Sequence, residues 1–347
     1  MKREEWLRVV EMRGPGPIPC RPVFAGSVWN QHRGKLQDVV NRYPELFEGM
    51  PPKGQWDAFP ERHTADQRSK DRWGCVWDNI QCGIIGQVVE HPLADWGALD
   101  NLTPPDPSRE NDFGDQDWVQ IARDVKTAKE AGDVTWGGIS HGFLFQRLYY
   151  LRGFENVMID YATGDKRLVR LIDMIVEFNA EIVRRYVELG VDCVGFGDDM
   201  GMQERFTISP NTWRRYIKPA YAKLFGMCRQ AGVHVHLHSD GYIADVLSDL
   251  VQIGVTIPNP QDLVNGLETI RRLLKGNVCI DLDIDRQRII PWGTPKQIDE
   301  HVRTCIETLG SQQGGLMLVC GVYAPTPLEN IEALLAAMSR YRMMFNS

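Results

Sequence analysis

The sequence lacks the features that place a protein in a membrane or in an oxidising compartment. No apolar run approaches the roughly 20 residues that span a bilayer, and residues 1–16 carry charges but no apolar signal-peptide core. The eight cysteines are scattered and include no Cys-x-x-Cys pair. We therefore expect a cytoplasmic protein with reduced thiols and no membrane partner.

Basic runs, repeats and low-complexity segments are also missing. Lys and Arg number 39 against 46 Asp and Glu, which gives a net charge of −7. A mildly acidic chain of this kind is a poor candidate for binding nucleic acid. With 43% hydrophobic and 24% charged residues over 347 positions, the composition is typical of a globular protein with a full core.

From residue 134 onward, short apolar runs alternate with long amphipathic stretches. Strands are expected at 22–28, 134–140, 191–197, 233–238, 254–258, 277–284 and 315–320, and helices at 165–190, 209–231, 242–253, 265–275, 295–309 and 326–342. Strand followed by helix, many times over, predicts a parallel sheet. The count favours a closed (β/α)8 TIM barrel over an open doubly wound sheet.

Residues 50–130 differ from the rest because they are rich in Trp, Pro, Asp and Gly and weak in periodicity. We interpret them as a lid over the barrel mouth, with a helix near 115–131. Because this region lacks a separable core pattern, residues 1–347 are predicted to form a single domain.

The strand at 233–238 carries the strongest site signal. His234, His236 and His238 alternate with aliphatic residues, so the three imidazoles share one face. The aliphatic face must pack on helices, which points the histidines into the barrel. Active sites of such barrels lie at the carboxyl ends of the strands, so His238 and the following Asp240 are the functional candidates, and His234 is a structural one.

Carboxylates mark two further strands. Asp281, Asp283 and Asp285 share one face of the strand at 277–284, with Arg286 as a neighbour, and buried carboxylates must be paired or metal-bound. The strand at 191–197 runs into Asp198 and Asp199. Adjacent residues face opposite ways, so at most one of these two points to the centre, as an acid, a base or a ligand.

The last strand places Cys320 and Tyr323 at the rim. Together with His238 and Asp240, Cys320 makes a nitrogen, oxygen and sulfur set that suits Zn²⁺ with an open position. Further substrate-binding candidates around the mouth are Trp29, Arg33, His141, Gln203, His236, Asp283 and Arg286, and Tyr323 is grouped with the two aspartates as catalytic.

Several motifs resemble the uroporphyrinogen decarboxylase superfamily. They are Gly-Asp-Asp-Met-Gly at 197–201, His-Leu-His-Ser-Asp-Gly-Tyr-Ile at 236–243, Asn-Pro-Gln at 259–261, Asp-Ile-Asp-Arg-Gln at 283–287, Gly-Thr-Pro at 293–295 and Thr-Pro-Leu-Glu-Asn-Ile at 326–331. The resemblance covers about residues 70–340. It implies a distorted TIM barrel and one of two chemistries, namely metal-free decarboxylation of a porphyrinogen or zinc-dependent methyl transfer with a corrinoid carrier.

The departures from the family favour methyl transfer. The decarboxylases' Met-Arg-Gln-Ala-Gly-Arg signature is absent, and Trp-Asn-Gln-His-Arg-Gly stands at 29–34. The methyltransferases bind zinc through a His-x-Cys pair and a distant Cys. His238 matches their His, Asp240 stands in place of the first Cys, and Cys320 falls near the second. Aspartate replaces a soft thiolate with a harder oxygen ligand, and such a site is compatible with an oxygen substrate such as a methoxylated aromatic compound.

These observations predict a zinc-dependent methyltransferase. It would move a methyl group between a small O-, S- or N-methyl compound and a corrinoid on a partner protein, with a homodimer as a further expectation from the family. The alternatives are a metal-free decarboxylase or lyase that uses Asp198, and a binding protein that has kept the barrel and lost the chemistry.

Overall fold

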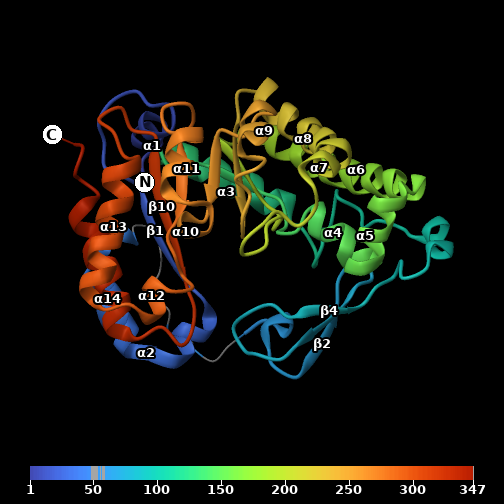
Figure 1. Ribbon diagram of the computed structural model, residues 1–347, viewed down its shortest axis with the longest axis horizontal. Helices are drawn as coiled ribbons and strands as arrows, with labels where there is room; N and C mark the ends of the chain where they lie inside the picture. The colour runs from blue at the N-terminus through green and yellow to red at the C-terminus, as the bar shows by residue number, and fades with distance from the viewer. Residues whose placement is uncertain (48–53, 55, 57–58, 347) are drawn as a thin grey trace.

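The computed structural model describes residues 1–47, 54, 56 and 59–346. Residues 50–53, 55, 57 and 58 of the predicted lid lie outside the described residues. The chain folds as an α/β barrel of TIM type, as predicted (Figure 1). Its parallel strands are β1 (Cys20–Phe24), β5 (Trp136–Gly138), β6 (Cys193–Gly197), β7 (His234–Ser239), β8 (Ile257–Pro260), β9 (Ile280–Asp283) and β10 (Leu316–Val322).

The parallel strands form two hydrogen-bonded groups, β5-β6-β7-β8 and β9-β10-β1. A parallel bridge between Gln261 and Asp283 links the end of β8 to β9. Among the described residues, no ladder pairs β1 with β5. The strand ring therefore has one side that backbone pairing does not close.

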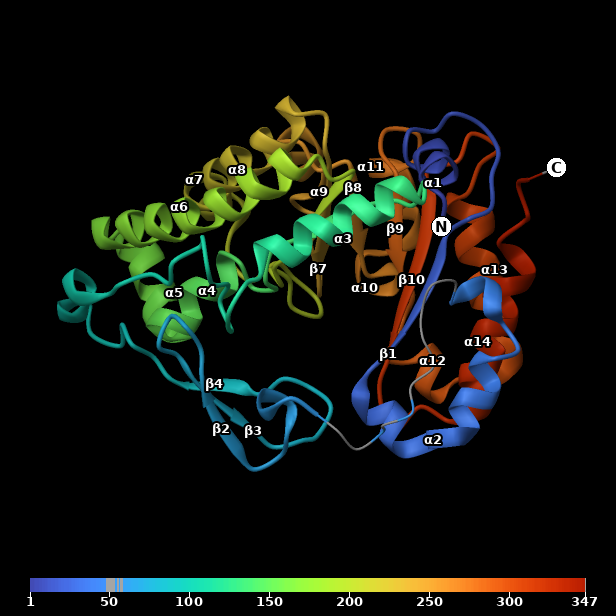
Figure 2. The same cartoon turned by 180° about the vertical axis from the view of Figure 1, so that it is seen from behind.

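Helices surround this ring on its outer side, and Figure 2 shows the long helix α3 running across the barrel toward α1. In the described chain no helix is both long and apolar enough to cross a bilayer. The helices are α1 (Arg3–Val10), α2 (Gly26–Val40), α3 (Trp118–Glu130), α4 (Phe145–Arg152), α5 (Phe154–Thr163), α6 (Lys166–Leu189), α7 (Pro210–Tyr216), α8 (Lys218–Gln230), α9 (Leu247–Gln252), α10 (Asp262–Asn265), α11 (Leu267–Leu274), α12 (Ile289–Trp292), α13 (Pro295–Leu309) and α14 (Leu328–Tyr341).

Several boundaries differ from the sequence prediction; for example, the helix predicted at 242–253 begins only at Leu247. The first strand ends at Phe24, and α2 begins at Gly26, because Val28 and Trp29 are buried as helical residues and not as strand residues. The helix predicted at 209–231 is two helices. Ser209 caps α7 by accepting the Thr212 amide at 3.0 Å, and Pro219 then lies in the first turn of α8, where a proline is tolerated.

In its described residues the predicted lid contains a small antiparallel sheet of β2 (Gln67–Lys70), β3 (Val76–Asn79) and β4 (Gln87–Glu90), and two 3-10 turns, η2 (Glu61–His63) and η3 (Trp96–Asn101). A further 3-10 turn, η1 (Pro44–Leu46), precedes it. The lid tryptophans Trp73, Trp77 and Trp96 are buried in the same apolar cluster as the barrel helices. Arg147 of α4 anchors the lid through Asp71 at 2.7 Å and Asp112 at 3.0 Å, all fully buried.

Candidate functional site

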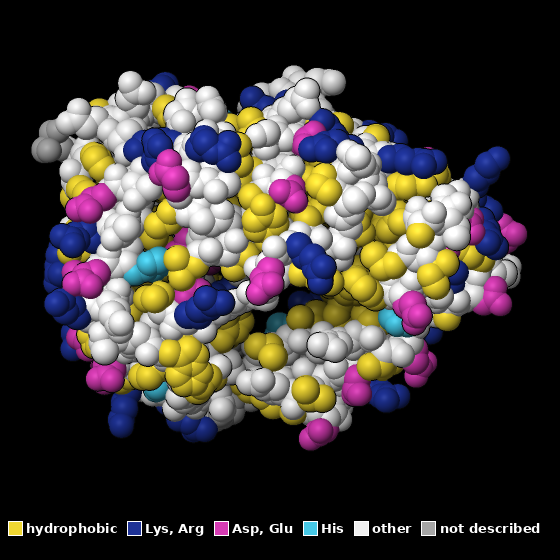
Figure 3. All heavy atoms as spheres, in the orientation of Figure 1, with side chains coloured by type: hydrophobic (Ala, Val, Ile, Leu, Met, Phe, Trp, Pro, Cys, Tyr) yellow, Lys and Arg dark blue, Asp and Glu magenta, His cyan; other side chains and the backbone are white. Residues whose placement is uncertain are grey.

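A cavity of about 330 Å³ lies inside the ring of parallel strands. Its wall includes His141, His236, His238, Asp283, Arg286 and Tyr323, together with Arg21, Asn259 and backbone of β6 and β10. In the space-filling view this face of the molecule is hollowed between the barrel and the small sheet of the lid (Figure 3). Trp29, Arg33 and Gln203, three predicted substrate-binding residues, are not among the residues of this wall.

The alternation in β7 places its histidines as predicted. Val235 and Leu237 are buried in the core, and His236 and His238 face the cavity. His236 contacts Asp281 at 2.9 Å. His234, at the other end of the strand, packs edge-on against Trp6 of α1 and lies 3.4 Å from Glu11.

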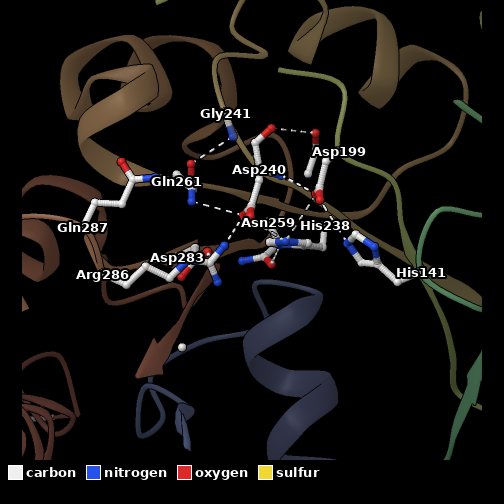
Figure 4. Close-up of polar contacts among 12 residues, drawn as sticks. His141, Asp199, His238, Asp240, Gly241, Asn259, Gln261, Asp283, Arg286 and Gln287 are labelled. Carbon is white, nitrogen blue, oxygen red and sulfur yellow. Dashed lines mark hydrogen bonds and ion pairs between the residues drawn. The ribbon is translucent and has the colours of Figure 1, made fainter. Parts of the chain in front are cut away.

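His238 is held in one orientation by its neighbours (Figure 4). Its Nδ1 lies 2.7 Å from Oδ1 of Asn259, and the Asn259 amide group donates to the Asp281 carbonyl. Since that amide fixes Oδ1 as the acceptor, Nδ1 of His238 carries the hydrogen. Nε2 then faces two carboxylates, Asp240 at 3.1 Å and Asp199 at 3.8 Å.

The charge of His238 follows from these contacts. Burial alone would lower the pKa of the imidazole, but the carboxylates of Asp240 and Asp199 outweigh it and raise the pKa to about 9. At neutral pH, Nε2 therefore holds a proton between the two carboxylates. A divalent cation at this point would take the place of that proton.

Asp199 is paired with His141 at 3.3 Å. Burial alone would raise the pKa of the Asp199 carboxyl group, but His141 and His238 have the larger combined effect and lower it to about 2. Gln146 of α4 also positions Asp199 through two hydrogen bonds. Its side-chain oxygen accepts from the Asp199 backbone amide at 3.0 Å, and its side-chain nitrogen donates to Oδ2 of Asp199 at 3.3 Å. Sequence reasoning did not find Gln146, since no periodic pattern singles out this residue at the start of a buried helix.

Asp240 and Asp283 flank Arg286. Arg286 donates to Oδ1 of Asp240 and lies 3.4 Å from Oδ2 of Asp283. Within the described residues both Asp283 oxygens are buried and accept no hydrogen bond. Burial raises the pKa of Asp283 to about 7, against the opposing influence of Arg286, so this carboxyl group is partly protonated at neutral pH.

These side chains suit a divalent cation. Two overlapping trios have donor atoms within 4.8 Å of one another, namely His141, Asp199 and His238, and His238, Asp240 and Asp283. Imidazole and carboxylate are ordinary ligands of Zn²⁺ and similar metals. The Asn259 contact to Nδ1 is the outer-shell partner that a metal-binding histidine needs, and the bare Asp283 oxygens are available as donors. We call His141, Asp199, His238, Asp240 and Asp283 the mouth cluster.

Cys320 does not join the mouth cluster in this structure. Its neighbours in β10, Val319 and Gly321, line the cavity, so Cys320 faces the opposite side of the strand. Its Sγ lies 3.8 Å from the Ile284 carbonyl, and burial raises the pKa of the thiol well above its usual range. The predicted ligand set of His238, Asp240 and Cys320 is therefore not assembled, and Asp283 stands near His238 and Asp240 instead.

Asp198 also points away from the cavity. It is fully buried and accepts the amides of Leu144 at 3.1 Å, Phe145 at 2.5 Å and Gln146 at 2.9 Å, as well as the Tyr221 hydroxyl at 2.8 Å. It thus satisfies the first amides of α4. Of the two adjacent aspartates only Asp199 reaches the site, as the expected alternation requires.

Of the remaining candidates, Tyr323 lines the cavity and the others do not. Tyr323 is half-exposed, and the Arg286 guanidinium lies 5.5 Å from its ring centre. Trp29 is buried against Phe24, Arg33 donates to the Asn30 carbonyl, and Gln203 is exposed between β6 and α7. Asp285 binds backbone amides before α12, the nearest being Ile289 at 2.6 Å, and so does not share the cavity face.

Comparisons with known proteins agree with this architecture. The methylcobamide:CoM methyltransferase MtbA of Methanosarcina mazei is 22% identical over 180 residues, which are 52% of this chain and 51% of that protein. The methylated-thiol–coenzyme M methyltransferase of the same organism is 24% identical over 194 residues, 54% of this chain and 48% of its own length. The chain thus matches about half the length of these curated relatives.

A solved structure matches nearly the whole chain. It is described as a methyltransferase from Methanosarcina mazei, is 16% identical, covers 96% of this chain and 98% of its own, and has a TM-score of 0.61. At this identity the match establishes the fold. The family model described as uroporphyrinogen decarboxylase (URO-D) matches residues 82–341, and the chain therefore belongs to the uroporphyrinogen decarboxylase family.

Proposed function

We propose that this protein is a methyltransferase that moves a methyl group between a small O-, S- or N-methyl compound and a corrinoid carried by a partner protein. The mouth cluster, with zinc as its first candidate metal, is the observation that carries this proposal. The activities for which the two Methanosarcina relatives are named, methyl transfer from a methylcobamide and from a methylated thiol to coenzyme M, support it.

A bound divalent metal would supply Lewis-acid activation of the heteroatom that gives up its methyl group. His238 and Asp240 would hold it, with Asp199 or Asp283 completing the set. Asn259 keeps Nε2 of His238 directed at the metal position. Asp240 replaces a thiolate with a harder oxygen donor, which favours an oxygen substrate such as a methoxylated aromatic compound.

Asp283 can supply the proton that the reaction needs. When the bond between the heteroatom and the methyl carbon breaks, the methyl group goes to the corrinoid and the heteroatom retains the electron pair. Where Asp199 and not Asp283 completes the ligand set, the carboxyl group of Asp283 is left to protonate the heteroatom. Arg286 and Tyr323, on the wall of the same cavity, would bind polar groups of the substrate.

The first test is metal content and methyl transfer in the wild-type protein and in His238→Ala. We expect zinc in the wild type, loss of the mouth metal in the variant, and a fall in methyl transfer of at least about 100-fold. Transfer can be followed by the absorbance change when free reduced cobalamin, as a surrogate carrier, is methylated from methoxylated aromatics or methyl thioethers.

His234→Ala is the matched control, because His234 lies on the same face of β7 at its far end. It should retain metal and activity. Unchanged metal content and activity in His238→Ala would overturn the proposal. A metal-free wild-type protein that decarboxylates a carboxylated compound would favour the alternative lyase.

Four further expectations belong with this proposal. A single domain is supported by the shared burial of the lid tryptophans with the barrel core. A corrinoid protein as partner follows from the proposed reaction. Cytoplasmic location and a homodimer stay predictions, which fractionation of cells and light scattering of the purified chain would check.

A further inference from the structure

A second group of metal-binding side chains lies outside the strand ring, between α10 and α13. Oδ2 of Asp262 lies 2.7 Å from Nε2 of His301 and 3.7 Å from Sγ of Cys305. Sγ lies 3.8 Å from the same Nε2 atom. We call these three residues the helix-layer cluster. His301 and Cys305 are four residues apart and so share one face of α13.

The geometry excludes a nucleophile activated by a histidine. In such a site the base uses one ring nitrogen for the thiol and the other for the orienting carboxylate. Here Asp262 and Cys305 both approach Nε2 of His301. Burial also raises the pKa of the Cys305 thiol well above its usual range, so the thiol is protonated without a metal, and a bound metal would displace that proton. The three donor atoms instead lie within 4.8 Å of one another, which is close enough for them to share one metal ion.

We propose that Asp262, His301 and Cys305 form a second divalent-metal site, selective for zinc or a similar thiolate-binding metal, that fastens α10 to α13. Tetrahedral zinc with ordinary bond lengths separates a sulfur from a nitrogen or oxygen ligand by about 3.6 Å. The two sulfur distances, 3.7 and 3.8 Å, are close to this value. The nitrogen and oxygen atoms, now hydrogen-bonded, would have to separate by about 0.6 Å.

Charge and access are both compatible with this site. A carboxylate and a thiolate balance the two positive charges of the metal, so the buried site would be neutral. Asp262 and Cys305 are completely buried, whereas the side chain of His301 keeps 11% of its exposure. The metal and one water ligand could therefore enter along the imidazole edge.

The position of Asp262 connects this site to the barrel mouth. Its Oδ2 accepts the Asp285 amide at 3.2 Å, where the chain leaves β9. The preceding residue, Gln261, donates to Asp240 at 3.1 Å. A metal at the helix-layer cluster would thus fix the ends of β8 and β9 from the outer side of the strand ring, without contacting substrate. The proposal does not depend on the reaction at the mouth.

Cobalt provides the decisive test, because the mouth cluster has only nitrogen and oxygen donors. Metal-stripped full-length protein is titrated with Co²⁺ and its near-ultraviolet absorption is recorded. We expect a sulfur-to-cobalt charge-transfer band in the wild type, its loss in Cys305→Ser, and its persistence in Cys320→Ser and His238→Ala. His301→Gln removes a different ligand and should also weaken the band, so it provides a second test in case Cys305→Ser folds poorly.

Each other outcome overturns the proposal in a distinct way. Absence of the band shows that no thiolate binds metal, while metal lost in His238→Ala would still support the mouth site. A band that disappears only in Cys320→Ser would move the thiolate to the mouth. Zinc stoichiometry gives a second measurement: two per chain in the wild type should become one in Cys305→Ser and one in His238→Ala.

Discussion

Polar side chains on the inner and outer sides of the barrel wall differ in how completely they are hydrogen-bonded. On the inner face, His238 and Asp283 line a cavity, Asp199 lies 3.8 Å from His238, and Asp283 accepts no hydrogen bond from the described residues. On the outer face, Asp198 has four donors and Asp262 is enclosed by α13. The outer groups serve the structure of the barrel, while Asp283 on the inner face retains unused hydrogen-bonding capacity. Unused capacity in a buried carboxylate marks the face where a ligand binds.

The largest effect we expect separates two adjacent aspartates. Asp198→Asn should lower the free energy of unfolding by about 2–3 kcal/mol, because its amide group would oppose the amides at the start of α4. Asp199→Asn should lower it by a smaller amount, through the lost pairing with His141 and His238, and should also reduce metal binding. Urea denaturation of both variants measures this, and equal destabilisation would contradict the contrast between the two faces.

A smaller effect concerns the pH dependence of stability in the metal-free protein. The pKa of His238 rises from 6.5 to about 9 on folding, so its proton stabilises the folded state fully below pH 6.5. That contribution is lost as the pH rises through 9. With a chelator present, the free energy of unfolding of the wild type at pH 6 should exceed that of His238→Gln by on the order of 2 kcal/mol. A difference that does not fade between pH 6.5 and 9 would show that the proton is absent.

Removing the partner of Nδ1 should have a still smaller effect. Asn259→Ala frees the His238 ring to rotate, and we expect metal affinity at the mouth to fall about tenfold. Competition with a chromophoric chelator measures the affinity. Asn277→Ala, an asparagine on the surface before β9, is the matched control. Equal affinities in the two variants would mean that Asn259 does not orient the ligand.

The smallest effect should come from Cys320→Ser. Because the thiol faces the helix layer and not the cavity, metal content and methyl transfer should stay at wild-type levels, and stability should fall by about 1 kcal/mol. Elemental analysis and thermal unfolding check both. A halved metal content would show that Cys320 is a metal ligand and would contradict the contrast between the inner and outer faces.

Sequence pattern predicted the inner face well where polar and apolar residues alternate. The alternation in β7 predicts that His238 faces inward, and His238 lines the cavity. Alternation likewise allows only one of Asp198 and Asp199 to reach the centre. In β10 every residue is buried, so no polar alternation shows which residues face inward, and Cys320 was assigned to the rim. Barrel architecture and most element boundaries followed from strand and helix periodicity alone.

The helix-layer cluster could not be predicted in the same way. The spacing of His301 and Cys305 on one helical face is visible in the sequence, but such pairs are common. Asp262 lies 39 positions earlier, and only the packing of α10 on α13 brings it to them. The lid contacts of Arg147 and the support that Gln146 gives Asp199 depend on tertiary packing in the same manner.

Helix α1 has a consequence for the order of folding. It spans the side of the ring where β1 and β5 are unpaired: Lys2 binds Asp133 at 2.8 Å, Arg3 binds Asp192 at 2.6 Å, and the Val9 carbonyl accepts the Gly315 amide. These partners are 131 and more residues away along the chain. Since α1 is synthesised long before them, it must wait unpaired on the ribosome, and closure of the ring becomes a late step of folding.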